Sequence, residues 1–191
     1  MQDSKNKYTT DFIIIGAGIL GLSIALKLLN AYPKAKISIL DKEGAVGEHA
    51  SGRNSGVLHS GIYYPPDSLK AKLCGEGAKA MLAYCQEHNL PWNKLGKVIV
   101  PTRADDEETL RMLYERGLVN GVHVEWIDEA QLAELEPLAR TATGRALLVP
   151  ETAVVDPKAI MLHLHQSLAA RGVNFYFNAC CEQVDVKTRT V

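Results

Sequence analysis

The sequence has few aromatic residues, few cysteines and no excess of charge of either sign. Aromatic residues make up 6% of the 191 residues, so aromatic platforms that stack single-stranded nucleic acid are not expected. The 21 Lys and Arg residues nearly balance the 22 Asp and Glu residues, which excludes a chain-wide basic field for nucleic acid or anionic lipid. Apolar residues reach 47%, too many for a disordered chain. A soluble globular α/β protein is therefore expected.

Disulfide, zinc and membrane chemistry also lack support. The cysteines, Cys74, Cys85, Cys180 and Cys181, have no CxxC spacing, so we expect reduced thiols in a cytoplasmic protein, without a disulfide or a metal site. The longest apolar stretch, residues 12–29, is interrupted by glycines and Lys27, and no small-residue cleavage site follows it. Neither a transmembrane segment nor a secretory signal is expected.

A βαβ unit opens the chain. Residues 11–15 form an apolar, β-branched run that predicts a buried parallel strand, residues 19–31 have helical composition, and residues 36–40 predict a second strand. No periodicity is visible over residues 42–66, and a loop of that length is usually functional. Further helices are expected at 68–88, 105–120, 129–135 and 157–171, and strands at 98–100, 122–127, 146–149, 173–177 and 182–186.

This order predicts one nucleotide-binding unit with an insertion. Residues 8–90 are expected to begin a nucleotide-binding domain, residues 91–150 to form an inserted, partly antiparallel segment, and residues 151–191 to return to the first domain. The expected fold class is α/β: a Rossmann-like FAD/NAD(P)-binding fold with a central parallel sheet, incomplete at the C-terminus.

The strongest motif is GxGxxG, which directly follows the first strand and opens the first helix. Gly16 permits the tight turn, Gly18 lets a pyrophosphate approach the backbone, and Gly21 lets the helix pack close to the sheet. The helix N-terminus, where Ile19 and Leu20 lie, supplies free N–H groups and a favourable dipole for the phosphates. The alternative is a glycine-rich turn without a ligand.

An acid stands where a dinucleotide needs one. Asp41 ends the second strand about 20 residues after the glycine motif and can accept hydrogen bonds from a ribose 2′-hydroxyl. Its charge would repel a 2′-phosphate. The motif and acid together predict a dinucleotide site, and they do not separate NAD from FAD.

The loop over residues 50–64 is dense in small residues and side-chain donors. Arg53 can offer a bidentate fork to a phosphate, and His59 can exchange a proton near neutral pH. Backbone N–H groups in such loops can reach an anion or a ring edge. The alternative is a surface loop whose polar residues have no ligand.

Three blocks of this sequence resemble FAD-dependent oxidoreductases of the D-amino-acid oxidase (DAO) superfamily. They are DFIIIGAGILGLSIALKL, ILDKE and SGRNSGVLHSGIYYPPDSLKAKLC. HSGIYY with SLKAKLC, the later GKVIVPT, and the stretch from Glu151 to Ala179 are similar to the L-2-hydroxyglutarate dehydrogenase/oxidase group in order and spacing. The resemblance covers nearly the whole chain from residue 10 onward.

The resemblance implies FAD as cofactor and oxidation of a 2-hydroxy acid, L-2-hydroxyglutarate first, by hydride transfer to flavin N5. His59 is the implied catalytic residue, as base or as a donor that positions the ring. Tyr64, Lys70 and Lys72 are substrate-side candidates, with a solvated helix face as the alternative for Lys72. The implied cofactor-binding residues are Gly16, Gly18, Ile19, Leu20, Gly21, Asp41, Lys42, Ser51, Arg53, Asn54, Ser55, Gly56, Val57 and Cys181.

Two departures keep the substrate open. The group usually has Glu at the position of Asp41 and His at that of Arg53, and SGRNSG is similar to the glycerol-3-phosphate dehydrogenase family. The alternatives are therefore a glycerol-3-phosphate dehydrogenase-like enzyme, an amino-acid oxidase-like enzyme, or an inactive FAD-binding fragment. Because the family's proteins are about twice as long, we expect a fragment with little or no turnover alone. The electron acceptor is expected to be oxygen or a quinone, and peripheral association with a membrane stays open.

Overall fold

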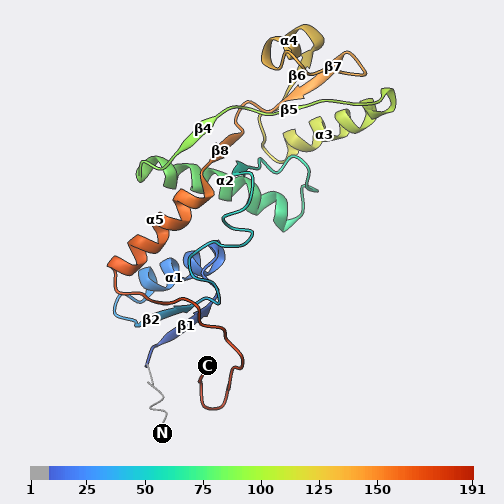
Figure 1. The fold of residues 1–191 in the computed structure, drawn as a ribbon. Coiled ribbons are helices and arrows are strands. Elements are labelled where there is room, and N and C mark those ends of the chain that lie inside the picture. Colours follow the sequence, from blue (N-terminus) through green and yellow to red (C-terminus); the bar gives the residue numbers. More distant parts are fainter. Residues whose placement is uncertain (1–8) are drawn as a thin grey trace. The chain divides into compact units, whose positions relative to one another are not determined.

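A computed structural model describes residues 9–191 and divides the chain into two compact units (Figure 1). The first unit comprises residues up to Asn54 together with Pro157–Val191, and the second comprises Ser55–Asp156. The sequence placed residues 55–90 with the first part, whereas here they group with residues 91–156. The reason is that the short strand after Gly56 pairs within the second unit, and Ile62 is buried in the core of that unit.

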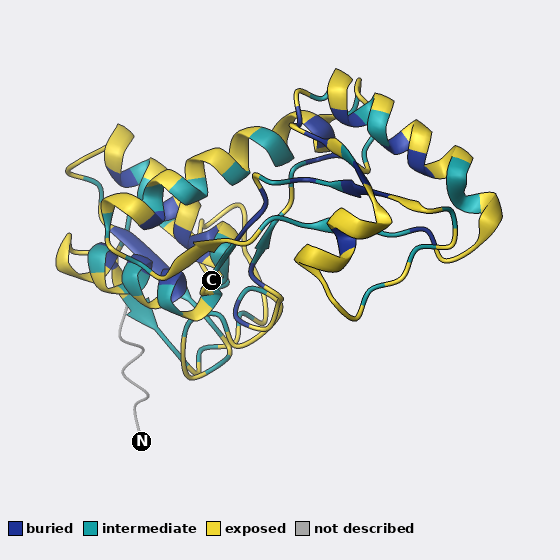
Figure 2. Ribbon diagram, turned by 90° about the horizontal axis from the view of Figure 1, so that it is seen from above, coloured by how far each residue is buried: buried dark blue, intermediate teal, exposed yellow. Residues whose placement is uncertain are grey.

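The first unit is a three-stranded parallel sheet with two helices. Its strands are β1 (Phe12–Ile15), β2 (Ile37–Leu40) and β9 (Asn174–Tyr176), in the order β1-β2-β9. Helix α1 (Ile19–Ala31) connects β1 to β2, and α5 (Pro157–Ala170) precedes β9. Ile37 and Ile39 of the central strand are almost fully buried, as Leu22, Ala25 and Leu168 are on the helices. Figure 2 shows buried segments on both strands and helices. The parallel sheet with helices confirms the expected α/β fold.

The expected strand over residues 182–186 is wrong. Those residues form no strand, and Asp185 makes only an isolated antiparallel bridge to Thr190. The carboxylate of Asp185 instead accepts hydrogen bonds from the N–H groups of Thr188 and Lys187, which hold the pKa of Asp185 below its ordinary value. An Asp that bonds the backbone two and three residues ahead favours a turn over an extended strand.

The second unit holds two small antiparallel sheets. One has the order β3-β8-β4, from Val57–Leu58, Ala153–Val155 and Trp92–Lys94, and the other has β5-β7-β6, from Val98–Ile99, Arg145–Leu148 and Glu125–Asp128. Helices α2 (Leu69–Glu87), α3 (Glu107–Val119, preceded by the 3-10 turn Ala104–Asp106) and α4 (Glu129–Leu135) complete the unit. The sequence predicted no strand at β3, β4 or β8, because runs of two or three residues carry no readable alternation.

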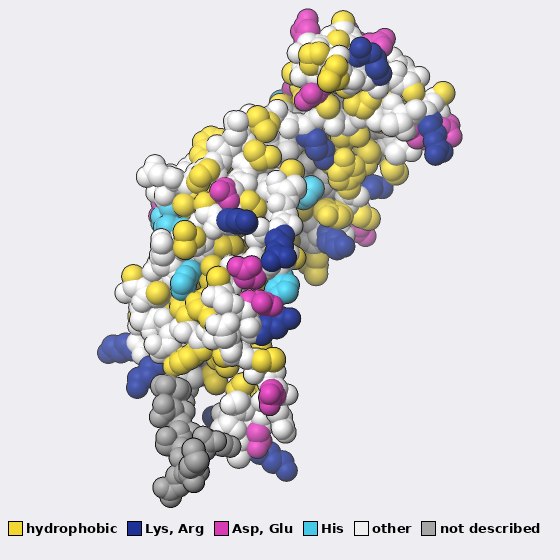
Figure 3. Space-filling model, in the orientation of Figure 1, with side chains coloured by type: hydrophobic (Ala, Val, Ile, Leu, Met, Phe, Trp, Pro, Cys, Tyr) yellow, Lys and Arg dark blue, Asp and Glu magenta, His cyan; other side chains and the backbone are white. Residues whose placement is uncertain are grey.

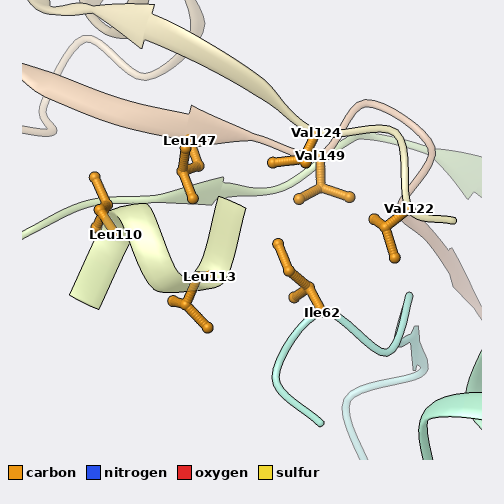
Figure 4. Close-up of a cluster of buried hydrophobic side chains, with 7 residues drawn as sticks. All are labelled: Ile62, Leu110, Leu113, Val122, Val124, Leu147 and Val149. Atoms are coloured by element: carbon orange, nitrogen blue, oxygen red, sulfur yellow. The ribbon is translucent and has the colours of Figure 1, made fainter. Parts of the chain in front are cut away.

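The core of the second unit joins the loop after β3 to α3 and the β5-β7-β6 sheet. Its buried side chains are Ile62, Leu110, Leu113, Val122, Val124, Leu147 and Val149, and Figure 4 shows Ile62 reaching from the loop toward the others. Gly117 of α3 makes room for this contact, because a Cβ there would lie 3.2 Å from a side-chain carbon of Ile62. The HSGIYY segment thus contributes Ile62 to the core of the second unit.

Charges on the surface are mixed in sign. On the face shown in Figure 3, basic and acidic side chains are interspersed, with hydrophobic side chains between them. Of the helices described over residues 9–191, none combines the length and apolar character that a membrane span requires.

Candidate functional site

The glycine motif forms a tight turn between β1 and α1. Gly16 has a φ of +103°, a conformation that favours glycine, and its N–H donates to the carbonyl of Leu40. At Gly21, a Cβ would overlap the carbonyl oxygen of Gly16 and would lie 3.3 Å from the Ile14 side chain. The helix can therefore lie this close to the turn only with glycine at position 21.

The N-terminus of α1 is left partly open. The N-cap residue Gly18 has no side chain to cap the helix, and the N–H of Ile19 donates instead to the hydroxyl of Ser51, at 3.1 Å. The N–H groups of Leu20 and Gly21 have no acceptor among residues 9–191. Free N–H groups at a helix N-terminus bind anions, and the missing Cβ at Gly18 makes room for the Ser51 hydroxyl, which would lie 3.1 Å from such a Cβ.

Replacing Ser51 with alanine is expected to lower the free energy of unfolding by about 1 kcal/mol, the usual cost of a lost helix cap. The substitution removes the hydroxyl that accepts from Ile19. Urea unfolding followed by circular dichroism measures the change. Ser23→Ala is the matched control, because Ser23 is exposed on α1 and should change stability little. An equal loss in both variants would contradict the capping role.

The carboxylate of Asp41 lies against the glycine turn. One of its oxygens accepts from the N–H of Ala17 at 2.6 Å, and the other accepts from the N–H of Glu43 at 2.9 Å. A carboxylate has about four acceptor sites, so each oxygen keeps capacity for a ribose hydroxyl. The predicted acid and the predicted glycine turn therefore meet at one end of the sheet.

The chain after β9 returns to the same place. The N–H of Ala179 donates to the carbonyl of Asp41, and the N–H of Asn178 donates to the carbonyl of Glu43, each at 2.9 Å. These bonds bring the segment that carries the half-buried Cys181 beside the loop after β2. Lys42, between the two carbonyls in sequence, is exposed. The cofactor-binding roles of Cys181 and Lys42 stay predictions.

The donors in the loop after β2 mostly bond within that loop. Asn54 donates its side-chain amide to the carbonyls of Ala50 and Ser51, at 3.0 and 2.9 Å. The exposed guanidinium of Arg53 lies 3.3 Å from the carboxylate of Glu48. Asn54 therefore shapes the turn that presents Ser51 to α1, while Arg53 points to a solvent-facing ion pair and not to the glycine motif.

The remaining predicted residues belong to the second unit. Ser55 is exposed, Gly56 has a φ of +69°, and Val57 pairs with Val154 in β3. His59 is exposed just after β3. Two substrate-side candidates are close together, since the ammonium of Lys70 lies 5.6 Å from the ring centre of Tyr64. Lys72 is exposed on α2, as a solvated helix face would have it.

Two carboxyl groups of the second unit have a lowered pKa because of contacts within that unit. The N–H groups of Thr102 and Arg103 donate to Asp106 and lower its pKa, and the ammonium of Lys94, at 2.9 Å, lowers the pKa of Glu151. Both acids lie outside the predicted site residues, so their shifts reflect turn and strand contacts.

A sequence profile of the family described as "DAO: FAD dependent oxidoreductase" matches residues 11–191. The chain belongs to this family. FAD is the cofactor of the DAO family, and the open helix N-terminus, the bare Gly18 and the carboxylate of Asp41 fit the pyrophosphate and ribose of such a dinucleotide. The expected family and cofactor are confirmed.

Curated DAO-family relatives are similar over most of this chain. L-2-hydroxyglutarate dehydrogenase of Escherichia coli K12 is 38% identical over 169 residues, which are 88% of this chain and 40% of that protein. The mitochondrial L-2-hydroxyglutarate dehydrogenase of Homo sapiens is 39% identical over 163 residues, which are 85% of this chain and 35% of that protein. The chain thus spans well under half the length of these relatives.

Solved structures of oxidoreductases share the fold. L-α-glycerophosphate oxidase from Mycoplasma pneumoniae, with FAD bound, has a TM-score of 0.84 and 25% identity and covers 95% of this chain and 48% of its own. Glycine oxidase from Geobacillus kaustophilus has a TM-score of 0.79 and 21% identity and covers 90% of this chain and 47% of its own.

Sequence reasoning missed a second close approach of backbones in this DAO-family site. A Cβ at Gly52 would overlap the carbonyl oxygen of Gly47, as one at Gly21 would overlap that of Gly16. Gly47 has a φ of +70°, and its N–H donates to the carbonyl of Ala17 at 3.2 Å. Gly47 and Gly52 repeat the spacing of Gly16 and Gly21, and this repeated spacing was the available signal.

Proposed function

We propose that the chain supplies the FAD-binding part, and the segment carrying His59, of an enzyme that oxidises a 2-hydroxy acid to a 2-oxo acid. The first unit is the FAD-binding part and the second the substrate side. L-2-hydroxyglutarate is the proposed substrate. The identity of 37–44% to proteins named L-2-hydroxyglutarate dehydrogenase, over most of this chain, carries the proposal.

When bound, FAD supplies the acceptor for the hydride that leaves the substrate Cα. In this proposal the imidazole of His59 takes the proton of the substrate hydroxyl, the general-base role that histidine fills most often in enzymes. Lys70, beside Tyr64, offers a cation for a substrate carboxylate. Ser55, Gly56 and Val57 provide backbone at the flavin side. Proton loss and hydride loss together leave the 2-oxo acid.

A second candidate is oxidation of glycerol 3-phosphate. Two observations favour it: Arg53 stands within SGRNSG, and the glycerophosphate oxidase structure is similar at a TM-score of 0.84. A third candidate is a chain that binds FAD without turnover.

For the enzyme the electron acceptor is proposed to be oxygen or a quinone, with a cytoplasmic location and peripheral contact with a membrane in the quinone case.

The test separates cofactor binding from chemistry. We expect the purified chain to bind FAD close to one to one, measured by quenching of flavin fluorescence. Under anaerobic conditions, we expect any bleaching of the flavin absorbance by this partial chain to be slow, and to be faster with L-2-hydroxyglutarate than with D-2-hydroxyglutarate, glycerol 3-phosphate or an amino-acid panel. Fastest bleaching by glycerol 3-phosphate would favour the second candidate, and bound FAD that no compound bleaches would favour the third. A chain that cannot take up FAD would contradict all three.

A further inference from the structure

The end of helix α3 holds the turn that follows His59. Asn120 ends this helix, and its backbone N–H donates to the carbonyl of Arg116 at 3.0 Å, so the residue is anchored by the helix. Its side-chain amide donates to the carbonyls of Gly61 and Tyr64, both at 3.0 Å. An amide NH₂ group has two donors, and here each meets one carbonyl of the same turn.

Arg116, one helical turn earlier, holds the carbonyl between them. Its guanidinium donates to the carbonyl of Tyr63 at 3.0 Å, and its other terminal nitrogen contacts the sulfur of Met112. Between Arg116 and Asn120, the buried Gly117 leaves the space that Ile62 fills. Arg116, Gly117 and Asn120, at the end of one helix, therefore contact all four residues of the Gly61–Tyr64 turn.

The turn also has an internal hydrogen bond and a contact with a lysine. The N–H of Tyr64 donates to the carbonyl of Gly61 at 3.1 Å, and Gly61 has a φ of +90°. The ammonium of Lys97 lies 4.2 Å from the ring centre of Tyr63, on the unit that also carries Arg116. Such cation–π contacts orient a tyrosine ring whose backbone is already held. The contacts from α3 thus hold the backbone from which both tyrosine rings project.

We propose that Asn120 and Arg116 are positioning residues that hold the Gly61–Tyr64 turn and, through it, the reactive segment around His59. They act through backbone carbonyls and use none of the side chains of the turn. A catalytic group must be held in place before the substrate arrives, and a second layer of hydrogen bonds does this. That Asn120 and Arg116 hold the turn rests on the hydrogen bonds alone. That this holding places His59 for catalysis rests on the proposed function.

The proposal is tested first without cofactor or substrate. Asn120→Asp puts a carboxylate oxygen against two carbonyl oxygens, so we expect the turn to open and the exchange of the Tyr64 amide hydrogen to rise about tenfold, measured by NMR. Asn120→Gln keeps the two donors and is expected to restore most of the protection. Arg116→Met, which removes only one bond to the turn, is expected to give a smaller rise and serves if Asn120→Asp fails to fold.

Two controls make the result specific. Asn93→Asp makes the same charge change on exposed β4, and Arg111→Met removes an exposed guanidinium from the same helix; both are expected to leave Tyr64 exchange unchanged. Equal acceleration at Leu113 and Leu147 in the core would show general destabilisation and overturn the proposal. An unchanged rate at Tyr64, or no rescue by Asn120→Gln, would also overturn it.

The consequence for chemistry has its own readout. If L-2-hydroxyglutarate bleaches the bound flavin, Asn120→Asp should slow bleaching while FAD affinity stays the same. Unaltered bleaching with an opened turn would remove the link to His59 and leave the turn contacts standing. If none of the tested compounds bleaches the flavin bound to the unaltered chain, the proposed function fails. The exchange measurements still decide the positioning role.

Discussion

Gly21→Ala is expected to lower the free energy of unfolding by about 3 kcal/mol and to weaken FAD binding about 100-fold. The new Cβ would overlap the carbonyl oxygen of Gly16 and lie 3.2 Å from its carbonyl carbon. Backbone cannot rotate away as a flexible side chain can, so α1 must shift from β1. That shift moves the N–H groups of Leu20 and Gly21, which we expect to hold the pyrophosphate. Urea unfolding and a fluorescence titration with FAD measure the two effects.

Gly77→Ala is the matched control for this substitution. Gly77 lies inside α2, and a Cβ there would meet no atom within 4 Å. Alanine is the better helix former, so this variant is expected to be more stable by about 0.5–1 kcal/mol and to bind FAD unchanged. A Gly21→Ala variant that kept both stability and FAD affinity would show that the helix can retreat without cost, and the close-packing argument would fail.

The cofactor side of the site could be predicted because its signals are local. The strand, the glycine motif, the helix and the acid of a βαβ unit lie within about 30 residues, and each has a sequence pattern of its own. The structure accordingly places Gly16, Gly18, Gly21 and Asp41 together. Ser51 also meets this group, through its bond to Ile19, although only the resemblance had suggested it.

The second unit could be predicted less well because its contacts are distant in sequence. Val57 pairs with Val154 and Asn93 also pairs with Val154, so this sheet forms from runs of two or three residues that show no alternation. The bonds from Asn120 to Gly61 and Tyr64 span more than 50 residues. A lone Asn at the end of a predicted helix normally indicates only where the helix stops. Its second role depends on which loop lies beside it, and only the tertiary structure shows that.

Asp41→Asn is expected to weaken FAD binding about 100-fold and to lower the free energy of unfolding by about 2 kcal/mol. Hydrogen bonds to an ionised acceptor are the stronger kind, and Asp41 accepts two of them, from Ala17 and Glu43. Asparagine keeps one oxygen, but its NH₂ group must face one of the two N–H groups. The same NH₂ group also replaces an acceptor that we expect the ribose to use. Affinity is measured by titration with FAD and stability by urea unfolding.

Two further variants separate the cofactor effect from the stability effect. Asp11→Asn is the matched control, because Asp11 accepts one bond from the N–H of Lys36, at 2.8 Å, beside the starts of β1 and β2. This substitution is expected to lower stability and to leave FAD affinity unchanged, because Asp11 lies at the other end of the strands. Asp41→Glu restores the acid that is usual in the L-2-hydroxyglutarate group and is expected to keep most of the affinity. If Asp11→Asn weakened FAD binding as much as Asp41→Asn, the loss would follow from the loosened sheet, and the ribose role of Asp41 would have to be abandoned.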